Sequence, residues 1–409
     1  MTERNKKPRI RFAEFSSPWE QRSFADFTFA AGKRNKENLN LKPYAVTNDR
    51  GFIPQDEAHD EFGYMKDTDR TAYNIVPPQS FAYNPARINV GSIGYYNGEE
   101  SVIVSSLYEV FQTKEYVDDR FLWHWIKSEQ LPRWINKLQE GSVRLYFYYD
   151  KLCECHLMLP SLEEQKKIAS FFDNVDNLIS LHQRKCDQIK TLKKATLQKM
   201  FPKEGETVPE IRFPGFVGDW EQRKVGEVSK RVIVGLATSV TPYYRAEGIP
   251  ILRNLNIKEN YLDDTDILFL ERSYAEGQVS KQIHTGDVLT VHTGYIGTSC
   301  VVPEKYDNCL TFTTLITTTD GSVLQGEFLA QYLNSEIGMS AVQAVTTQGG
   351  RQNLNTNDFV KVEIRYPSVV EQDRICKMLR DIDNLITLHQ RKCDELKELK
   401  KGLLQQMFV

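Results

Sequence analysis

LISLHQRKCD (Leu178–Asp187) returns almost letter for letter as LITLHQRKCD (Leu385–Asp394), 207 positions further along the chain. The repeat extends well beyond these ten residues, because Pro160–Phe201 aligns with Pro367–Phe408 without a gap. A repeat of this length indicates two copies of one structural unit. We therefore expect a chain made of two halves with a common plan.

The two halves are related as if the chain were a ring. PRIRFAEFSSPWEQR (Pro8–Arg22) matches PEIRFPGFVGDWEQR (Pro209–Arg223). Seven residues join the end of the first long repeat to Pro209, and a link from the end of the second repeat to Pro8 would have almost the same length. Circularly related halves predict neighbouring chain termini and a pseudo-two-fold axis.

The composition is that of a globular protein with two or three domains. The chain has 409 residues, a net charge of -3, 40% hydrophobic and 26% charged residues. No apolar run is long enough to cross a membrane, and no apolar segment follows the basic N-terminus as in a secretory signal. Seven cysteines, an odd number, fit reduced thiols better than a disulfide framework. We expect a cytoplasmic protein without a membrane partner.

Each copy of the long repeat reads as one helix. It opens with a proline and then S-x-x-E, at Ser161 and at Ser368, which is the capping-box signature of a helix start. Apart from Gly402, neither copy contains a glycine or a proline after this signature. The predicted segments are a first domain at 1–158, a long helix at 159–201, a linker and second domain at 202–365, and a second long helix at 366–409.

Heptad spacing within these helices predicts an antiparallel coiled coil. A His-x-x-Lys pair falls near the middle of each helix, and we interpret it as a device that fixes the register. Pairs of His and Cys four residues apart could instead supply a zinc site, but the interleaved lysines oppose a cation and we expect no metal. The predicted seam residues are Val175, Leu178, His182, Lys185, Ile189, Leu192, Ile382, Leu385, His389, Lys392, Leu396, Leu399 and Leu403.

The segments between the helices share a skeleton but little identity. Residues 24–158 and 225–365 both read as mixed α/β modules with short strands, which gives an α+β fold class. Each contains a predicted hairpin with a glycine turn, where GSIG (Gly91–Gly94) lies over GYIG (Gly294–Gly297). Glycines in both turns allow positive φ and a close approach of a partner. A constant frame with two divergent modules suggests one geometry and two different ligands.

Polar loops of the modules are candidate DNA contacts. TTQGGRQNLNTND (Thr346–Asp358) is rich in Gln, Asn and Arg, the side chains that pair with base edges. The alternative is an ordinary solvated loop. Arg144 aligns with Arg351, which favours a shared phosphate or base contact. The candidate contacts are Arg87, Ser92, Tyr95, Arg144, Tyr146, His292, Thr293, Tyr295, Gln348, Arg351 and Asn353.

These patterns resemble the specificity subunit of type I restriction-modification systems. The resemblance is carried by LPSLEEQKKIASFF and YPSVVEQDRICKML leading into the repeated helices, and it covers essentially the full chain. It implies two target-recognition domains that each read one half of a bipartite double-stranded DNA target, held by an antiparallel coiled coil. It also implies docking of two modification subunits that methylate adenine with S-adenosylmethionine, and of two ATP-driven restriction subunits. Base contacts cannot be carried over, because these domains vary most.

No catalytic motif is visible in the chain. A Walker A sequence does not occur, and YNPAR (Tyr83–Arg87) only partly matches the motif of adenine methyltransferases. We expect a non-catalytic subunit without its own cofactor; S-adenosylmethionine, ATP and Mg would belong to its partners. An alternative left open is a scaffold with two protein-binding modules and no DNA. A DNA mimic would need a far more acidic surface than a net charge of -3 provides.

Overall fold

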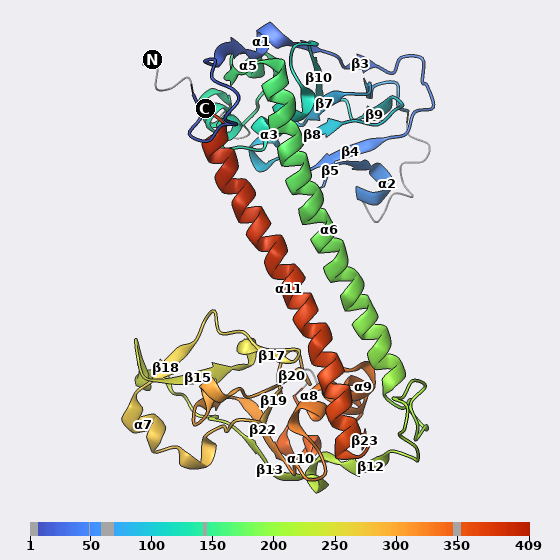
Figure 1. The fold of residues 1–409 in the computed structure, drawn as a ribbon, viewed down its shortest axis with the longest axis vertical. Coiled ribbons are helices and arrows are strands. Elements are labelled where there is room, and N and C mark those ends of the chain that lie inside the picture. Colours follow the sequence, from blue (N-terminus) through green and yellow to red (C-terminus); the bar gives the residue numbers. More distant parts are fainter. Residues whose placement is uncertain (1–6, 49, 59–68, 142–144, 347–352) are drawn as a thin grey trace. The chain divides into compact units, whose positions relative to one another are not determined.

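The computed structural model describes residues 7–409 except 49, 59–68, 142–144 and 347–352. The chain divides into two compact units: unit 1 is Met1–Gln183 with Gln390–Val409, and unit 2 is Arg184–His389. Each unit holds one mixed α/β domain and parts of both long helices, α6 (Leu162–Met200) and α11 (Val369–Met407) (Figure 1).

The same antiparallel four-stranded sheet lies at the centre of both domains. Its strand order is β2-β10-β7-β8 in unit 1 and β13-β22-β19-β20 in unit 2. The strands of unit 1 are β2 (Thr28–Ala30), β7 (Ser80–Tyr83), β8 (Ile93–Tyr96) and β10 (Glu109–Thr113). Those of unit 2 are β13 (Ser229–Val234), β19 (Val288–Val291), β20 (Ser299–Val301) and β22 (Thr314–Thr319).

The outer strands of the two domains differ. Unit 1 has an antiparallel sheet, β3-β6-β9, and a hairpin, β4-β5, whereas unit 2 has a sheet β14-β18-β15-β21 with a parallel pair and a short hairpin, β16-β17. The bounds in unit 1 are β3 (Lys33–Arg34), β4 (Tyr44–Thr47), β5 (Gly51–Pro54), β6 (Asn74–Val76) and β9 (Val102–Val104). Those in unit 2 are β14 (Tyr244–Arg245), β15 (Ile249–Arg253), β16 (Ile257–Lys258), β17 (Tyr261–Leu262), β18 (Leu268–Leu270) and β21 (Leu310–Phe312).

A helix pair packs beside each central sheet at matching sequence positions. In unit 1 the pair is α3 (Asp119–Ile126) and α4 (Gln130–Leu138), and in unit 2 it is α8 (Gly326–Asn334) and α9 (Glu336–Val345). The shorter helices are α1 (Phe24–Phe27), α2 (Gln55–Ala58), α5 (Tyr149–Cys153), α7 (Arg272–Glu276) and α10 (Thr356–Phe359).

A two-stranded ribbon leads into each long helix. β1 (Glu20–Ser23) pairs with β11 (His156–Leu159), and β12 (Glu221–Lys224) pairs with β23 (Glu363–Tyr366) in the same register. The backbone N–H groups of residues 9 and 10 donate to the carbonyl of Gln406, so the N-terminal segment meets the last turn of α11. This contact confirms the circular relation of the halves.

The predicted helix starts are confirmed, because α6 and α11 begin directly after Ser161 and Ser368.

A buried glutamine in the first turn ties each helix to its domain. Gln165 Oε1 accepts the N–H of Asp118 at 2.9 Å while its Nε2 donates to the Pro160 carbonyl at 2.9 Å. Gln372 repeats this arrangement in unit 2.

The glutamate of each S-x-x-E signature serves another role than the expected reciprocal cap. Glu164, with a side chain 1% exposed, accepts two charge-assisted bonds from Arg11 at 2.7 Å and one from the Trp19 indole at 3.3 Å. Arg212 and Glu371 form the same pair in unit 2. The segment that carries the arginine, which we call the linker strap (residues 8–19 and 209–220), is therefore held on the helix start. The signature predicted the helix start but not this bond.

The seam of the long helices follows alternating spacings of four and three residues. In both units the helices run antiparallel, since Lys400 binds Asp176 in unit 1 and Lys193 binds Asp383 in unit 2. The buried or half-buried seam residues of α6 are Ile168, Phe172, Val175, Ile179, His182, Cys186, Ile189, Lys193, Thr196 and Met200, and those of α11 lie 207 positions later.

The second heptad position of the predicted seam was wrong by one residue. Leu178 and Leu192 are 45% and 59% exposed, and Lys185 is exposed as well. Their repeats, Leu385, Lys392 and Leu399, lie equally on the outer surface. The inward positions belong to Ile179, Cys186 and Lys193 and their repeats. The lysine is tolerated there because it pairs with an aspartate of the other helix.

Two observations bear on the zinc alternative and on membranes. The buried Cys186 directs its Sγ to the Ile386 carbonyl at 3.9 Å, and Cys393 directs its Sγ to Gln183 Oε1 at 3.6 Å. Across the described part of the chain, no three His, Cys, Asp or Glu side chains gather as metal ligands. Nor does any described helix combine the length and apolar character that a membrane crossing needs.

The contact between domain and helix has opposite polarity in the two units. In unit 1 Arg120 on α3 pairs with Asp173 on α6, whereas in unit 2 the repeat positions carry Glu327 and Arg380. The buried His124 also contacts Asp173, with Nε2 2.9 Å from Oδ1. Burial lowers the pKa of His124 to about 4, although the hydrogen bond to Asp173 opposes that shift.

Ile179→Glu tests the corrected seam. A carboxylate there must be desolvated between the helices, so the free energy of unfolding should fall by more than about 2 kcal/mol. Leu178→Glu, one residue away on the outer surface, should change it by less than about 0.5 kcal/mol. Urea unfolding of the isolated chain measures both, and equal losses would contradict the seam.

His124→Gln, which copies Gln331 of the second half, tests the buried imidazole. The folded pKa of about 4 lies below the ordinary value of 6.5, so stability is complete above pH 6.5 and falls as the pH drops towards 4. Wild-type protein should lose roughly 2–3 kcal/mol more than the variant between pH 6.5 and 4.5. Urea unfolding across this range is the measurement, and parallel curves would refute the assignment.

Candidate nucleic-acid interface

In unit 2 the candidate contacts gather after β19. His292 Nδ1 lies 2.8 Å from Asn353 Oδ1, and Thr293 and Asn353 form an isolated backbone bridge. The amide of Asn254, in the turn directly after β15, donates to Thr293 Oγ1 at 3.0 Å and braces the loop. These bonds fix the loop at the end of β19 before a ligand binds, which lowers the entropy cost of binding.

Tyr295 is the most exposed aromatic group of this cluster. It is 89% exposed, between Gly294 and Gly297 at φ 83° and 91°. Both glycines have the left-handed backbone conformation, which side chains disfavour. A Cβ atom on Gly297 would also lie only 3.0 Å from Met339 Sδ. The loop therefore presents an aromatic ring to solvent on a backbone that only glycine readily adopts.

A polar hollow of about 550 Å³ lies beside this loop. His292 and Asn353 line it together with Asn355, Asn357 and Asp358 around the start of α10. Imidazole and amide groups provide both donors and acceptors, which is what reading base edges requires. Gln348 and Arg351, predicted for the same region, lie outside the described residues.

The candidate contacts of unit 1 are divided. Arg87 is exposed, and Tyr146 is half-buried with its ring stacked on Tyr148 at 5.5 Å. Ser92 is only 4% exposed and donates to the Val46 carbonyl at 2.8 Å. Arg144 lies outside the described residues.

Ser92 and Tyr95 were wrongly expected to face DNA. The Tyr95 hydroxyl donates to Asp119 at 3.1 Å, and burial raises the pKa of Tyr95. Gly94 sits inside strand β8, paired with Ala82, whereas Gly297 lies in the loop before β20. GSIG and GYIG are therefore not equivalent turns, and the predicted left-handed pair exists only in unit 2.

The family model of the type I restriction modification DNA specificity domain matches the chain twice, at residues 19–191 and 218–398. The chain belongs to this family. It is thus a specificity subunit with two target-recognition domains in tandem. Membership of this family implies that DNA and partner subunits are involved in its role. The repeat that sequence analysis found is the tandem pair of family domains.

Two curated relatives are similar over most of their length. The putative type I restriction enzyme MjaX specificity subunit of Methanocaldococcus jannaschii is 24% identical over 97% of this chain and 94% of its own. The type I restriction enzyme MjaVIII specificity subunit of the same organism is 22% identical over 78% of this chain and 76% of its own.

Solved structures share the fold at low identity. A chain from a study of complex assembly and conformational transition of the type I R-M system gives a TM-score of 0.57 at 17% identity, covering 95% of this chain and 97% of that one. The type I S subunit from M. genitalium gives 0.53 at 12% identity, covering 98% and 99%. These likenesses support the two-domain fold of the specificity subunit.

Sequence reasoning missed two features of the surface. Asn254 braces Thr293 but lies about 40 residues away in the chain, so no local pattern signals it. Four outward leucines of the long helices, Leu178, Leu192, Leu385 and Leu399, were assigned to the seam, although their spacing from it was visible, and Leu181 and Leu388 were not singled out. On each helix they form one stripe: Leu178, Leu181 and Leu192 on α6, and Leu385, Leu388 and Leu399 on α11.

Ser92→Ala should act on stability. The buried Val46 carbonyl would lose its donor, so the free energy of unfolding should fall by about 1 kcal/mol. Tyr295→Ala should leave it within about 0.5 kcal/mol, because that side chain is exposed. Thermal unfolding of both variants checks this, and a stable Ser92→Ala protein would argue against the buried hydrogen bond.

Proposed function

We propose that this specificity subunit recognises a bipartite double-stranded DNA target, with each domain reading one half. It performs no catalysis and binds no cofactor, and two modification and two ATP-dependent restriction subunits assemble on it in the cytoplasm. The observation that carries the proposal is a duplicated frame bearing two different loop surfaces. One frame with unlike loops suits an asymmetric target with a fixed geometry.

The loop of unit 2 has the chemistry of base readout. His292, Thr293 and Asn353 offer hydrogen-bonding groups, and the Tyr295 ring can stack or contact a thymine methyl. Gln348 and Arg351 are proposed as further contacts on the same side. In unit 1 we propose Arg87, Tyr146 and Arg144.

The charge of the chain fits shared phosphate binding. Lone DNA-binding proteins are usually basic, because phosphate neutralisation drives their affinity. A net charge of -3 leaves much of that task to the other subunits of the complex. The specificity subunit then contributes base readout more than bulk affinity.

The paired helices are proposed to set the distance between half-sites. α6 and α11 each contain 39 residues, or about 58 Å of helix at ~1.5 Å per residue. The lysine–aspartate ion pairs between the two antiparallel helices favour a single register of the helix pair. A spacer of defined length and register is what a bipartite target with a fixed gap requires.

The leucine stripes are the proposed docking faces for modification subunits. At about 100° per residue, Leu178, Leu181 and Leu192 lie within about 60° of one another around α6. The stripe lies about 90° from the seam, the angle at which a helix in a four-helix bundle meets its second neighbour. We infer that partner helices pack against these stripes to complete a bundle.

Tyr295→Ala tests DNA recognition by unit 2. In the assembled complex it should weaken binding of target DNA by about tenfold and leave random DNA unchanged, since stacking contributes ~1–3 kcal/mol. Val217→Ala is the control, because that side chain is also 89% exposed in unit 2. Fluorescence anisotropy at several salt concentrations measures both; no sequence-specific, salt-dependent binding by the wild-type complex would favour a scaffold without DNA.

Leu388→Lys tests the docking face. A charge on an exposed leucine should spare the fold but lower affinity for the modification subunit by at least about tenfold. Val279→Lys, at an aliphatic position of unit 2 that is more exposed than Leu388, should have no effect. Calorimetric titration with purified modification subunit gives the answer, and identical behaviour of the two variants would contradict docking on the stripe.

A further inference from the structure

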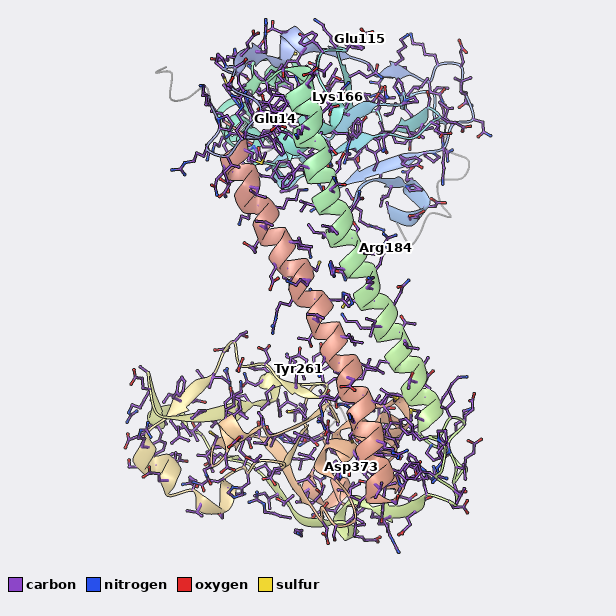
Figure 2. All side chains as sticks on the ribbon, in the orientation of Figure 1. Glu14, Glu115, Lys166, Arg184, Tyr261 and Asp373 are labelled. Atoms are coloured by element: carbon purple, nitrogen blue, oxygen red, sulfur yellow. The ribbon has the colours of Figure 1, made fainter. Side chains whose placement is uncertain are left out.

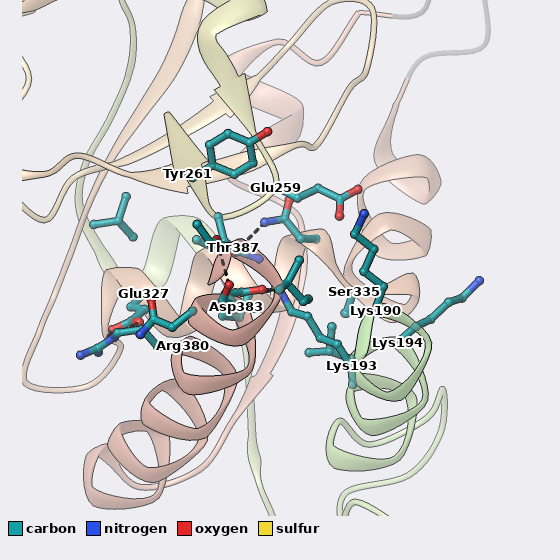
Figure 3. Close-up of a pocket in the computed structure, with 18 of the residues that line it drawn as sticks. Lys190, Lys193, Lys194, Glu259, Tyr261, Glu327, Ser335, Arg380, Asp383 and Thr387 are labelled. Atoms are coloured by element: carbon teal, nitrogen blue, oxygen red, sulfur yellow. Dashed lines mark hydrogen bonds and ion pairs between the residues drawn. The ribbon is translucent and has the colours of Figure 1, made fainter. Parts of the chain in front are cut away.

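Unit 2 contains a cleft that lies outside the proposed DNA surface and beyond the leucine stripes themselves. It has a volume of about 810 Å³ and lies between α6, α11 and the domain (Figure 3). Lys190 and Lys194 come from α6, Arg380 and Asp383 from α11, and Glu259 from the β16-β17 hairpin. Tyr261 projects from the same hairpin at the rim, and it is labelled in Figure 2 as well.

The matching positions of unit 1 carry large side chains. α3 and α8 align at an offset of 207, so Ala330 and Asn334 of the cleft correspond to Trp123 and Lys127. In unit 1 the Lys127 ammonium lies 4.4 Å from the Trp123 ring, and burial lowers the pKa of Lys127. Unit 1 therefore uses its own indole and lysine where unit 2 has small side chains bordering open space.

The cleft contains polar groups whose bonding is incomplete. Gln331 is 2% exposed and its Oε1 has no hydrogen-bond partner within the described chain. An unpaired buried carbonyl destabilises the fold, and a hydrogen-bond donor from a ligand would remove that cost. Lys190 and Glu259 are exposed to solvent, and unlike the other charged residues of the cleft they make no ion pair with any described residue.

Charge balance in the cleft disfavours a nucleic-acid backbone. Three of its four cations already have carboxylate partners: Lys193 with Asp383 at 2.6 Å, Lys194 with Glu336 at 2.9 Å, and Arg380 with Glu327 at 2.9 Å. The remaining groups are one ammonium, one carboxylate and one amide acceptor. A balanced set of donors and acceptors suits a polypeptide, whereas a lining with as many carboxylates as cations gives a phosphate chain no net attraction.

We propose that this cleft binds a polypeptide segment of one modification subunit. The inference rests on the docking role proposed for the leucine stripes. Leu388 lies one turn beyond Asn384, a residue of the cleft wall, so the stripe on α11 borders the cleft. A subunit docked on the stripe can extend a segment into it, and Trp123 denies the second subunit the same contact. The two copies should therefore bind with unequal affinity.

Lys190→Glu is the test, and Lys397→Glu is its matched control. Lys397 is the repeat of Lys190, on the same face of α11 but outside the cleft. Titration of the full-length chain with purified modification subunit should show two unequal affinities, and Lys190→Glu should weaken the tighter one by about tenfold. Lys397→Glu should leave both unchanged.

Gln331→Leu supplies an arm that separates binding from folding. It removes the unpaired carbonyl, so it should not lower the melting temperature of the free chain, yet it should also weaken the tighter site severalfold. Two equal sites, or equal effects of the two lysine variants, would overturn the proposal. If Leu388→Lys abolishes binding while Lys190→Glu does not, docking stands and the cleft inference fails. Loss of DNA binding by the isolated chain in Lys190→Glu would assign the cleft to nucleic acid instead.

Discussion

Two lysine–aspartate pairs hold the register on which the molecule depends. Lys193 binds Asp383 in unit 2 and Lys400 binds Asp176 in unit 1, each at 2.6 Å and with the lysine largely shielded from solvent. A slip of one residue would turn each side chain by about 100° and break both pairs. Unit 1 is also built from two segments that are far apart in the sequence, because the C-terminal part of α11 packs with the first domain. Unit 2 joins the end of α6 to the start of α11, on either side of the second domain. Register and domain integrity are thus one constraint.

Duplication with divergence explains most other features. The frame residues that tie helix to strap and ribbon, Arg11 with Glu164 and Arg212 with Glu371, are the same in both copies. The contact between domain and helix is chemically inverted, with the carboxylate on α6 in unit 1 and on the domain in unit 2. Like charges would meet if either domain packed on the wrong helix, so the inversion favours the native pairing. The loops above this frame are free to differ, which is where DNA recognition is proposed.

The sequence predicted the parts of the fold that local pattern determines. The spacing of the repeated segments predicted the two copies and their circular relation. The proline and S-x-x-E signature predicted where each long helix begins, and the structure agrees with each of these predictions. The second seam position was missed because Leu178 looks more apolar than Cys186 or Lys193, and the aspartate that neutralises Lys193 is distant in sequence. Ser92 was misplaced because the two hairpins differ in length, which shifts aligned glycines from loop to strand. Contacts such as Asn254 with Thr293 are tertiary and leave no local trace.

The most direct test of the central claim is mapping of adenine methylation in cells carrying this subunit and its modification partner. The account predicts a bipartite motif with a fixed gap. A variant shortened by one heptad in both helices, about 10 Å, should methylate the same half-sites with the gap reduced by about three base pairs. A contiguous motif, or an unchanged gap in the shortened variant, would contradict recognition by two domains on a helical spacer.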